Sequence, residues 1–334
     1  MVLISVVIVN YNGLKFLDDC IKSYLDQDLN KKHYEIILVD NASTDGSVEF
    51  IKNKFQNIAV IELEKNYGYA GGANKGAERA RGRYVVISNV DVKVPRNFLS
   101  AVISEFRKDP NLAVIGVMTS EDFLEKSLHS IWGTYVKNAC DDSDKLFGLG
   151  CVLAYNREKM GLPFFEEYFM YHEDVSIYLR AKLLGYTTKA LKKPLIWHAG
   201  GGIASLERSK LRVYYLNRNR LLNMLIFYST KTLLKIMPVI LLMTVFSPIY
   251  IILSYPRSQW FLKEYFKAYL WIILNIRGII KRRTEVQKHR KFNDDQVLRY
   301  FTCKIAADSN TLNKLVEAYT RLLKIPCYER SLKN

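Results

Sequence analysis

The sequence is poor in cysteine, and the few cysteines that it has are scattered. Its 334 residues include five, an odd number without a CxxC pair (Cys20, Cys140, Cys151, Cys303 and Cys327). This usage is typical of a reducing compartment, and it excludes a disulfide framework and a cysteine-based zinc site. A signal peptide is not expected either, because the apolar start Met1–Val9 has no basic region and runs directly into Asn10–Gly13.

Two common phosphate-binding signatures are also missing. No P-loop is present, and the glycine-rich stretch Gly68–Gly76 lacks the GxGxxG spacing of a dinucleotide site. The sequence also has no basic patch with interleaved aromatic residues, so nucleic acid is not expected as a partner. The net charge of +16 still indicates a polyanionic partner, such as anionic lipid headgroups or a phosphorylated substrate.

The first 120 residues alternate short β-branched runs with amphipathic segments. This alternation predicts an α/β fold, with a mostly parallel, Rossmann-like sheet and helices on both faces. The predicted strands are Ser5–Val9, Glu35–Val39, Ile58–Leu63, Tyr84–Ser88 and Leu112–Val117. The predicted helices between them are Leu14–Asp26, Ser47–Phe55, Ala70–Ala80 and Pro95–Lys108. Less regular sequence follows, with a strand near 148–155, a helix over Asp174–Leu184 and a strand end at Leu195–His198.

The composition changes after residue 204. Residues 205–235 form a basic helical linker, and 236–280 are expected to form membrane-associated helices, because Ile236–Tyr255 holds twenty uncharged residues. The tail 281–334 is basic and helical, with thirteen basic and six acidic residues. A spanning helix, a kinked re-entrant hairpin and a helix lying on the bilayer all fit 236–280, as does a buried hairpin in a soluble protein. The catalytic domain is then expected at 1–204.

Two carboxylates define the expected reaction centre. Asp91 follows the strand Tyr84–Ser88, and Asp174 begins the helix that ends near Leu184. Ligands of such sheets bind beyond the carboxyl ends of the strands, where Tyr11, Asp40 and Asp91 all fall. A loop carboxylate can hold a metal, and a second carboxylate can act as a base. Because a helix N-terminus favours an ionised acid, Asp174 is expected to be a weak base.

Six stretches together resemble the family-2 inverting glycosyltransferases, which have the GT-A nucleotide-sugar-binding fold. They appear in the family's order, and the similarity is closest to the rhamnosyltransferase-like branch. The stretches are Val6–Gly13, Leu38–Ser47, Asn66–Gly76, Asn89–Asp91, Tyr171–Asp174 with Arg180, and Trp197–His198. The chain departs from the family pattern at Asn89–Asp91, where one acid of the common DxD pattern and the usual proline are absent, and at Ser176, where an acid is common.

The resemblance implies a role for each motif. Asp174 would be the general base and Glu173 would bind the acceptor or orient the site, although both could be ordinary first-turn acids. Asp91 and His198 would hold Mn²⁺ or Mg²⁺, although a histidine in this setting is often structural. Tyr11 could stack on a base or only pack at its strand end, and Asp40 could bind the donor or stabilise a turn. The donor-binding residues would be Val9, Tyr11, Asn12, Asp40, Asn66, Gly71, Asn74 and Asn89.

The expected function is transfer of a single sugar from a UDP- or dTDP-sugar to a membrane-held, polyprenyl-linked glycan. The catalytic domain would lie on the cytosolic face of the cytoplasmic membrane, held against anionic lipid by the basic C-terminal half. The alternative is a non-catalytic, nucleotide-sugar-binding subunit of a glycan assembly complex, suggested by the missing DxD acid. Replacement of Asp174 by asparagine separates the two functions.

Overall fold

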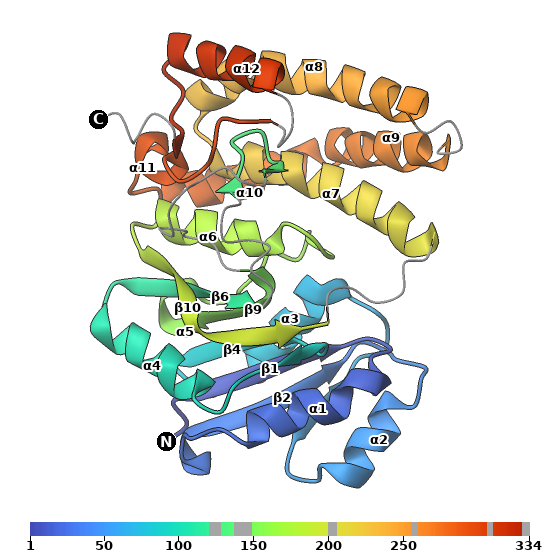
Figure 1. The fold of residues 1–334 in the computed structure, drawn as a ribbon, viewed down its shortest axis with the longest axis vertical. Helices are drawn as coiled ribbons and strands as arrows, with labels where there is room; N and C mark the ends of the chain where they lie inside the picture. Colours follow the sequence, from blue (N-terminus) through green and yellow to red (C-terminus); the bar gives the residue numbers. More distant parts are fainter. Residues whose placement is uncertain (120–127, 137–148, 200–205, 255–258, 306–309, 329–334) are drawn as a thin grey trace. The chain divides into compact units, whose positions relative to one another are not determined.

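The alternation of β-branched runs and helices produces an eight-stranded sheet, as a computed structural model shows (Figure 1). The structure describes all residues except 120–127, 137–148, 200–205, 255–258, 306–309 and 329–334. The chain divides into two units. Unit 1 holds residues 1–122, 144–181 and 186–202, and unit 2 holds 123–143, 182–185 and 203–334.

Unit 1 contains the sheet, whose strand order is β3-β2-β1-β4-β9-β6-β10-β5. Its first strands are parallel and end together at one edge: β1 Ile4–Asn10, β2 Tyr34–Asp40, β3 Ala59–Glu62 and β4 Tyr84–Asn89. The helices between and after them are α1 Leu14–Leu25, the short η1 Lys31–His33, α2 Ser47–Lys54, α3 Gly68–Arg79 and α4 Phe98–Lys108. These elements agree with the predicted ones to within a few residues at each end.

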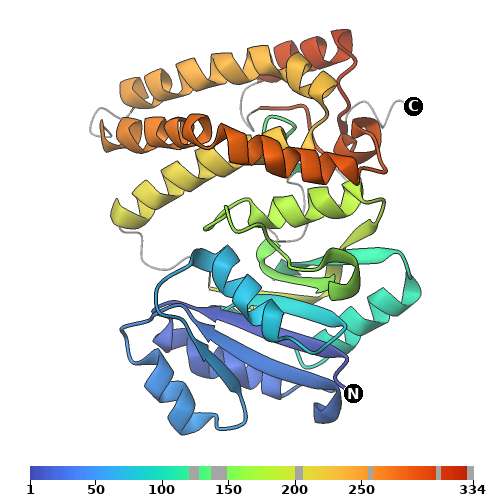
Figure 2. The same ribbon diagram turned by 180° about the vertical axis from the view of Figure 1, so that it is seen from behind.

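Helices cover both faces of this sheet (Figures 1 and 2). Apolar side chains of α1, α2 and α4 form one core with alternate residues of the strands, such as Ile4, Val6 and Ile8. Helix α3 lies on the other face, where a Cβ at Gly76 would come within 2.2 Å of Val7. The small residues of α3 therefore allow the helix to approach the strands closely, which explains the glycines in a stretch that is otherwise helical.

The second half of unit 1 adds strands that are not all parallel. β9 Leu149–Asn156 runs antiparallel between β4 and β6 Leu112–Thr119. β10 Thr187–His198 runs parallel to β6, and its end pairs antiparallel with β5 Val92–Lys93. Between β9 and β10 lie α5 Arg157–Met160 and α6 Glu173–Leu183. The mostly parallel α/β sheet is thus confirmed.

Unit 2 is mainly helical. Its helices are α7 Leu206–Phe227, α8 Thr230–Ser254, α9 Gln259–Leu274, α10 Ile276–Lys288, α11 Asp294–Leu298 and α12 Asn310–Leu322. A small hairpin, β7 Leu128–His129 and β8 Tyr135–Val136, belongs to this unit although it precedes β9 in sequence. Trp132 in its turn is fully buried and donates its indole N–H to the carbonyl of Cys303 at 2.7 Å. This early segment was not recognised as part of the C-terminal unit from sequence.

Two predicted helices are each divided in the structure. The basic helix expected over 204–235 ends at Phe227, and a new helix begins at Thr230 because Ser229 caps it, accepting a hydrogen bond from the N–H of Thr232 at 3.2 Å. The apolar stretch from Trp260 to Ile280 is also two helices, which meet at Asn275. Asn275 donates its side-chain amide to the carbonyl of Trp271 at 2.9 Å, so its side chain ends the first helix.

Helix α8 has an unusual surface for a helix of a folded unit. Its segment Thr230–Ile249 is long and apolar enough to cross a membrane by length and composition, and only 22% of its apolar window is buried. The exposed residues share one face of the helix: Leu234, Leu241, Leu242, Val245, Phe246, Ile249 and Leu253. The opposite face packs on unit 2 through the buried side chains of Ile236 and Ile240. The helix is therefore only half covered by the protein that the structure describes.

Candidate active site

The edge of the sheet where β1, β2 and β4 end carries most of the predicted site residues. β9 runs antiparallel to β4, with Ser88 opposite Val152, so its first residues lie at this same edge. A Cβ at Gly13, just after β1, would come within 2.6 Å of Val90, which follows β4. The motifs that follow β1 and β4, about 80 residues apart in the sequence, are thus in contact.

Asp40 lies at the centre of a hydrogen-bond network at the ends of β1 and β2. The carboxylate is buried and accepts hydrogen bonds from the side-chain amide of Asn10 and from the N–H of Ser43, each at 2.8 Å. The hydroxyl of Ser43 in turn accepts from the N–H of Asn12 at 2.9 Å, and the side chain of Asn12 accepts from the N–H of Thr44 at 2.8 Å. Both oxygens of Asp40 therefore already stabilise the loop, as the turn interpretation expects.

Tyr11 and Val9, next to this network, differ in accessibility. The Tyr11 side chain is 52% exposed, so its ring is open to a ligand. Val9 is buried and faces α3, where a Cβ at Gly72 would come within 2.9 Å of it. A ligand could meet Val9 only through its backbone.

The glycine-rich motif forms the start of α3. Asn66 accepts a hydrogen bond from the N–H of Gly68 at 2.7 Å, which fixes the turn into the helix. Gly68 has a positive φ of 73°, and a Cβ there would lie 2.3 Å from the carbonyl oxygen of Phe169. The N-terminus of α3 thus rests on the loop that leads to Glu173 and Asp174. A larger residue at Gly71 would press on the Tyr67 side chain, 2.6 Å away.

Asn74 is placed differently from the other residues of this motif. Its side chain is buried and binds the backbone of Phe164 in both directions, donating to the carbonyl at 3.0 Å and accepting from the N–H at 3.1 Å. Its amide therefore joins α3 to the chain that follows α5. A donor would reach it only by replacing these bonds.

Asp91 and His198 meet because β10 pairs with β5. His198 lies opposite Val92 in this pairing, and its Nε2 is 3.4 Å from Oδ1 of Asp91. Burial alone would raise the pKa of Asp91, but the hydrogen bond and charge of His198, with a smaller contribution from Asn89, lower it below the usual value. Asp91 is therefore held as a carboxylate, and the structure brings the two predicted metal ligands together.

The donor set of Asp91 and His198 suits a divalent ion, but it is small. One carboxylate oxygen and one imidazole nitrogen are ligands that Mn²⁺ accepts more readily than Mg²⁺ does. Among the described residues, no group of three or more His, Cys, Asp or Glu side chains could hold a metal ion. These two side chains would therefore share an ion with oxygens from a substrate and from water.

Glu173 and Asp174 begin α6 and are both withdrawn from solvent. Burial, and then the charge of Asp174, raise the pKa of Glu173 to about 8. Burial also raises the pKa of Asp174, although Oδ1 accepts a hydrogen bond from the N–H of Val175 at 2.8 Å. Desolvation thus outweighs the helix N-terminus, and the expectation of a weak, readily ionised Asp174 is wrong on this point.

Cys151 shows that Asp91 and Asp174 face the same region. It is a buried residue near the start of β9, and burial followed by the charges of Asp91 and of Asp174 raises its pKa to about 12. The residue before it, Gly150, touches Asp174 directly, since a Cβ there would lie 2.7 Å from Oδ2. The end of β4 and the start of α6 therefore meet over the first residues of β9.

Arg180 and Ser176 on α6 have structural contacts. The guanidinium of Arg180 donates to the carbonyls of Met160, Leu162 and Pro163. Ser176 is buried, and its hydroxyl donates to the carbonyl of Glu173 at 2.7 Å. Both residues hold the first turns of α6 in place.

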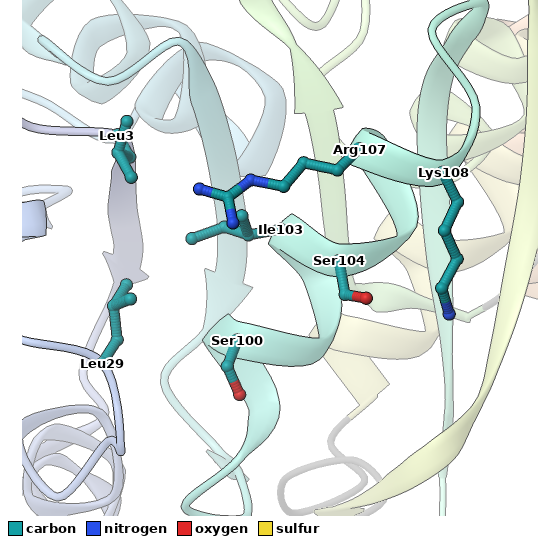
Figure 3. A pocket seen from close by; sticks show the side chains of 7 residues that line it. All are labelled: Leu3, Leu29, Ser100, Ile103, Ser104, Arg107 and Lys108. Atoms are coloured by element: carbon teal, nitrogen blue, oxygen red, sulfur yellow. The ribbon is translucent and has the colours of Figure 1, made fainter.

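A surface pocket of about 310 Å³ lies at the other end of the strands. Figure 3 shows that it is lined by five residues of α4 between Ser100 and Lys108, together with Leu3 and Leu29. Leu3 precedes β1, whereas the residues discussed above follow it. The pocket has no carboxylate in its lining and is separate from the candidate site.

Comparisons with known proteins agree with these motifs. The sequence model described as "Glycosyl transferase family 2" matches residues 5–162. The putative teichuronic acid biosynthesis glycosyltransferase TuaG of Bacillus subtilis is 32% identical over 169 residues, which are 48% of this chain and 64% of TuaG. The poly(ribitol-phosphate) β-N-acetylglucosaminyltransferase TarS of Staphylococcus aureus is 30% identical over 33% of this chain and 20% of its own. The chain thus spans less than two thirds of either relative.

Solved structures share the fold. Residues 1–349 of S. aureus TarS, in complex with UDP-GlcNAc, superpose with a TM-score of 0.55 at 16% identity, covering 86% of this chain and 90% of that one. The mannosyltransferase PcManGT of Pyrobaculum calidifontis, in complex with GDP-Man and Mn²⁺, gives 0.52 at 18% identity, covering 65% and 62%. At these identities the likeness shows the fold alone, and it confirms the expected GT-A architecture.

Proposed function

We propose that this chain, which belongs to glycosyl transferase family 2 through residues 5–162, transfers a sugar from a nucleotide-sugar donor to an acceptor hydroxyl. The observation that carries the proposal is the position of Asp174. Its half-buried carboxyl, whose pKa is raised, lies over the first residues of β9, beside the region of Asp91. A desolvated base next to a group that can face a diphosphate is what a displacement at an anomeric carbon needs.

In this reaction Asp174 takes the proton of the acceptor hydroxyl. The acceptor oxygen forms a bond to the anomeric carbon while the bond from that carbon to the diphosphate oxygen breaks, and the configuration inverts. The nucleoside diphosphate leaves with the electron pair of the broken bond. Because burial raises the pKa of Asp174, its carboxylate is a stronger base than an exposed aspartate would be. Glu173, whose Oε2 is buried without a hydrogen-bond partner among the described residues, would bind an acceptor hydroxyl or orient the site.

On the donor side, the accessible ring of Tyr11 would stack on the nucleobase. The loop stabilised by Asp40 and Asn12 would present its backbone and polar groups to the base and ribose. The start of α3, with Asn66 and Gly71, would lie near the sugar or the diphosphate, where a helix N-terminus favours negative charge. The backbone of Val9, Asn74 at the side of α3 and Asn89 at the end of β4 would complete this surface.

Asp91 and His198 would hold a divalent metal ion, Mn²⁺ or Mg²⁺. Such an ion supplies neutralisation of the charge that develops on the departing diphosphate. The lowered pKa of Asp91 supports this assignment, because a metal ligand must be ionised when the ion arrives. The structural relative PcManGT, which was solved with Mn²⁺, adds further support.

The donor would be a UDP- or dTDP-sugar, and a single sugar would be added. TarS, which shares the fold over 86% of this chain, was solved with UDP-GlcNAc. The names of TuaG and TarS refer to teichuronic acid biosynthesis and to poly(ribitol-phosphate). These relatives support a role in polysaccharide assembly. The acceptor would be a polyprenyl-linked glycan. The rhamnosyltransferase-like branch stays a prediction.

Unit 2 would attach the enzyme to the cytosolic face of the cytoplasmic membrane. The exposed apolar face of α8 supports this, because a soluble protein seldom leaves so continuous a surface uncovered. Basic residues flank it, and each could add about 1 kcal/mol of attraction to anionic lipid. Since the opposite face of α8 packs on unit 2, a helix lying in the interface fits better than one that spans the bilayer alone. Residues 1–204 would then be the catalytic domain, 205–235 and 236–280 the linker and membrane helices, and 281–334 the cytosolic tail.

The test is a donor panel. Full-length protein in vesicles containing anionic lipid and a lipid extract is incubated with labelled UDP-, dTDP- and GDP-sugars, with and without Mn²⁺. We expect transfer from one uridine or thymidine donor, dependent on Mn²⁺ and lost with Asp174→Asn. Asp26→Asn, an exposed acid that lies beside Arg96, is the matched control. Full turnover by Asp174→Asn would overturn the enzymatic assignment in favour of a binding subunit.

A further inference from the structure

Three elements meet at Gly150, near the start of β9. The hydroxyl of Tyr69, in the first turn of α3, donates to the carbonyl of Gly150 at 3.2 Å. Asp174, in the first turn of α6, lies against the Cα of the same glycine. The base, the helix of the donor motif and the central sheet are thus joined at one residue.

Glycine is required here by space. A Cβ on residue 150 would lie 2.7 Å from Oδ2 of Asp174 and 3.0 Å from its Cβ and Cγ. The contact includes the Cβ of Asp174, so a rotation of the carboxylate alone would not relieve it. Any side chain at position 150 would therefore displace the first turn of α6 and move the base.

Tyr69 holds the other side of the same peptide group. Burial, and then the charges of Glu173 and other groups in the site, raise the pKa of Tyr69 well above its usual value, so its hydroxyl stays a donor. The ring packs against Phe164, with 6.1 Å between the ring centroids. The hydroxyl is thus aimed at the Gly150 carbonyl by a ring that is itself held in place.

The same turn of α3 is attached to the loop before the base. The N–H of Ala70 donates to the carbonyl of Phe169 at 3.3 Å, and Gly68 lies directly against that carbonyl. A shift of α3 would therefore displace both Phe169, in the loop before Asp174, and Gly150, which lies against Asp174.

We propose that Tyr69 and Gly150 are positioning residues for Asp174: Gly150 provides the space that the carboxyl occupies, and Tyr69 fixes the Gly150 peptide group beneath it. This inference rests on the proposed function, because it takes Asp174 as the base. Neither residue exchanges a proton or forms a bond with the substrate in this assignment. Both act through the place and the surroundings of Asp174.

The experiment compares Tyr69→Phe with Tyr34→Phe in the full chain. Tyr34, at the opposite end of the sheet, makes the same kind of bond, from its hydroxyl to the carbonyl of Leu25 at 3.2 Å. Both variants keep the ring and lose one hydrogen bond, so we expect similar small losses of Tm. With the donor found in the panel, only Tyr69→Phe should lower kcat, by about tenfold, with the donor KM unchanged.

The pH dependence of kcat gives the second readout. Without the hydroxyl, the Gly150 carbonyl loses its donor, and the uncompensated peptide group of the residue that lies against Asp174 disfavours the charged form of Asp174. The acid limb of the Tyr69→Phe profile should therefore move to higher pH, while that of Tyr34→Phe should match the wild type. Gly150→Ala should lower kcat by about a hundredfold. Gly278→Ala, where a Cβ meets nothing within 4 Å, is its control.

The outcomes separate the two proposals. If Tyr69→Phe matches Tyr34→Phe in both kcat and acid limb while Asp174→Asn is inactive, the positioning role is overturned and the proposed function stands. If Asp174→Asn keeps its turnover, the proposed function itself fails. If Gly150→Ala does not fold, the comparison of Tyr69→Phe with Tyr34→Phe still tests the positioning role.

Discussion

The regions around Asp91 and Asp174 hold two half-buried carboxyl groups whose pKa values are shifted in opposite directions. At Asp91, His198 outweighs the cost of burial and the pKa is lowered. At Asp174 burial outweighs the hydrogen bond from the N–H of Val175, and the pKa is raised. Both charges act on Cys151, so the two states are maintained within one site. The difference shows how one sheet edge can provide an ionised ligand and a proton acceptor from the same type of side chain.

A pair of asparagine variants tests most directly whether Asp91 and Asp174 have different roles. Asp174→Asn should lower kcat by about 10²- to 10⁴-fold, the usual contribution of a general base, and leave donor binding unchanged. Asp91→Asn should instead weaken Mn²⁺-dependent binding of the nucleoside diphosphate. Calorimetric titration with UDP and Mn²⁺, alongside turnover, distinguishes them. Equal effects on binding would mean that the two acids do not have separate roles.

His198→Ala tests whether His198 is the cause of the lowered pKa of Asp91. Loss of the imidazole removes a metal ligand and also allows the pKa of Asp91 to rise, so Mn²⁺ affinity should fall by about tenfold or more. The apparent Mn²⁺ constant for activity measures this effect. His33→Ala is the control, because His33 directly precedes β2, at the opposite end of that strand from Asp40, and its Nδ1 lies 3.3 Å from the carbonyl oxygen of Met1. A change in the control as large as that in His198→Ala would refute the assignment.

Much of this arrangement could be predicted from sequence, for physical reasons. The strands around Asp40 and Asp91 are β-branched runs buried on both faces, and the order of parallel strands places their ends together. The raised pKa of Asp174 could not be predicted, because it depends on how deeply packing buries the start of α6. The contacts of Tyr69 with Gly150 and of Trp132 with Cys303 join distant segments that no local pattern connects. The short cap at Ser229 is a local signal that could have been read.

The two regions should also differ in how their acids make stability depend on pH. Glu173 has a pKa of about 8 in the folded protein, above its ordinary value of 4.5, so the folded state binds the proton more tightly. Its contribution to stability is then fully present below pH 4.5 and is lost as the pH rises towards 8. The slope is at most about 1.4 kcal/mol per pH unit. Asp91 has the opposite sign, since its lowered pKa adds stability above pH 3.8 that is lost on acidification.

Glu173→Gln should therefore reduce the loss of stability between pH 5 and pH 8, to which Asp174 also contributes, and urea unfolding at several pH values measures it. The variant should be no less stable than the wild type at pH 8, because a neutral amide replaces a group that is costly to ionise there. Glu49→Gln, a first-turn acid of α2, is the matched control and should keep the wild-type slope. An unchanged slope in Glu173→Gln would show that Glu173 is not the buried acid responsible.

The loop after Asp40 and the loop before Asp174 both contain residues other than glycine with a positive φ. Substitution at such a position gives the smallest effect that we expect. Ala42, next to the Asp40 network, has a φ of 62°, and Tyr171 and His172, before the base, have φ values of 65° and 64°. A left-handed conformation costs a residue with a Cβ about 1 to 2 kcal/mol, and glycine avoids this cost but loses more entropy on folding. Ala42→Gly should therefore stabilise the protein by about 0.5 kcal/mol, measured by urea unfolding. Gly161→Ala, at a φ of 64° and a ψ of −129° with nothing within 4 Å of its Cβ, should destabilise it by about 1 to 3 kcal/mol, because that backbone conformation is open to glycine but strained for alanine. If Ala42→Gly raises the free energy of unfolding while Gly161→Ala lowers it, the backbone at Ala42 is strained in the folded state. If both variants lower it, the backbone at Ala42 is not strained.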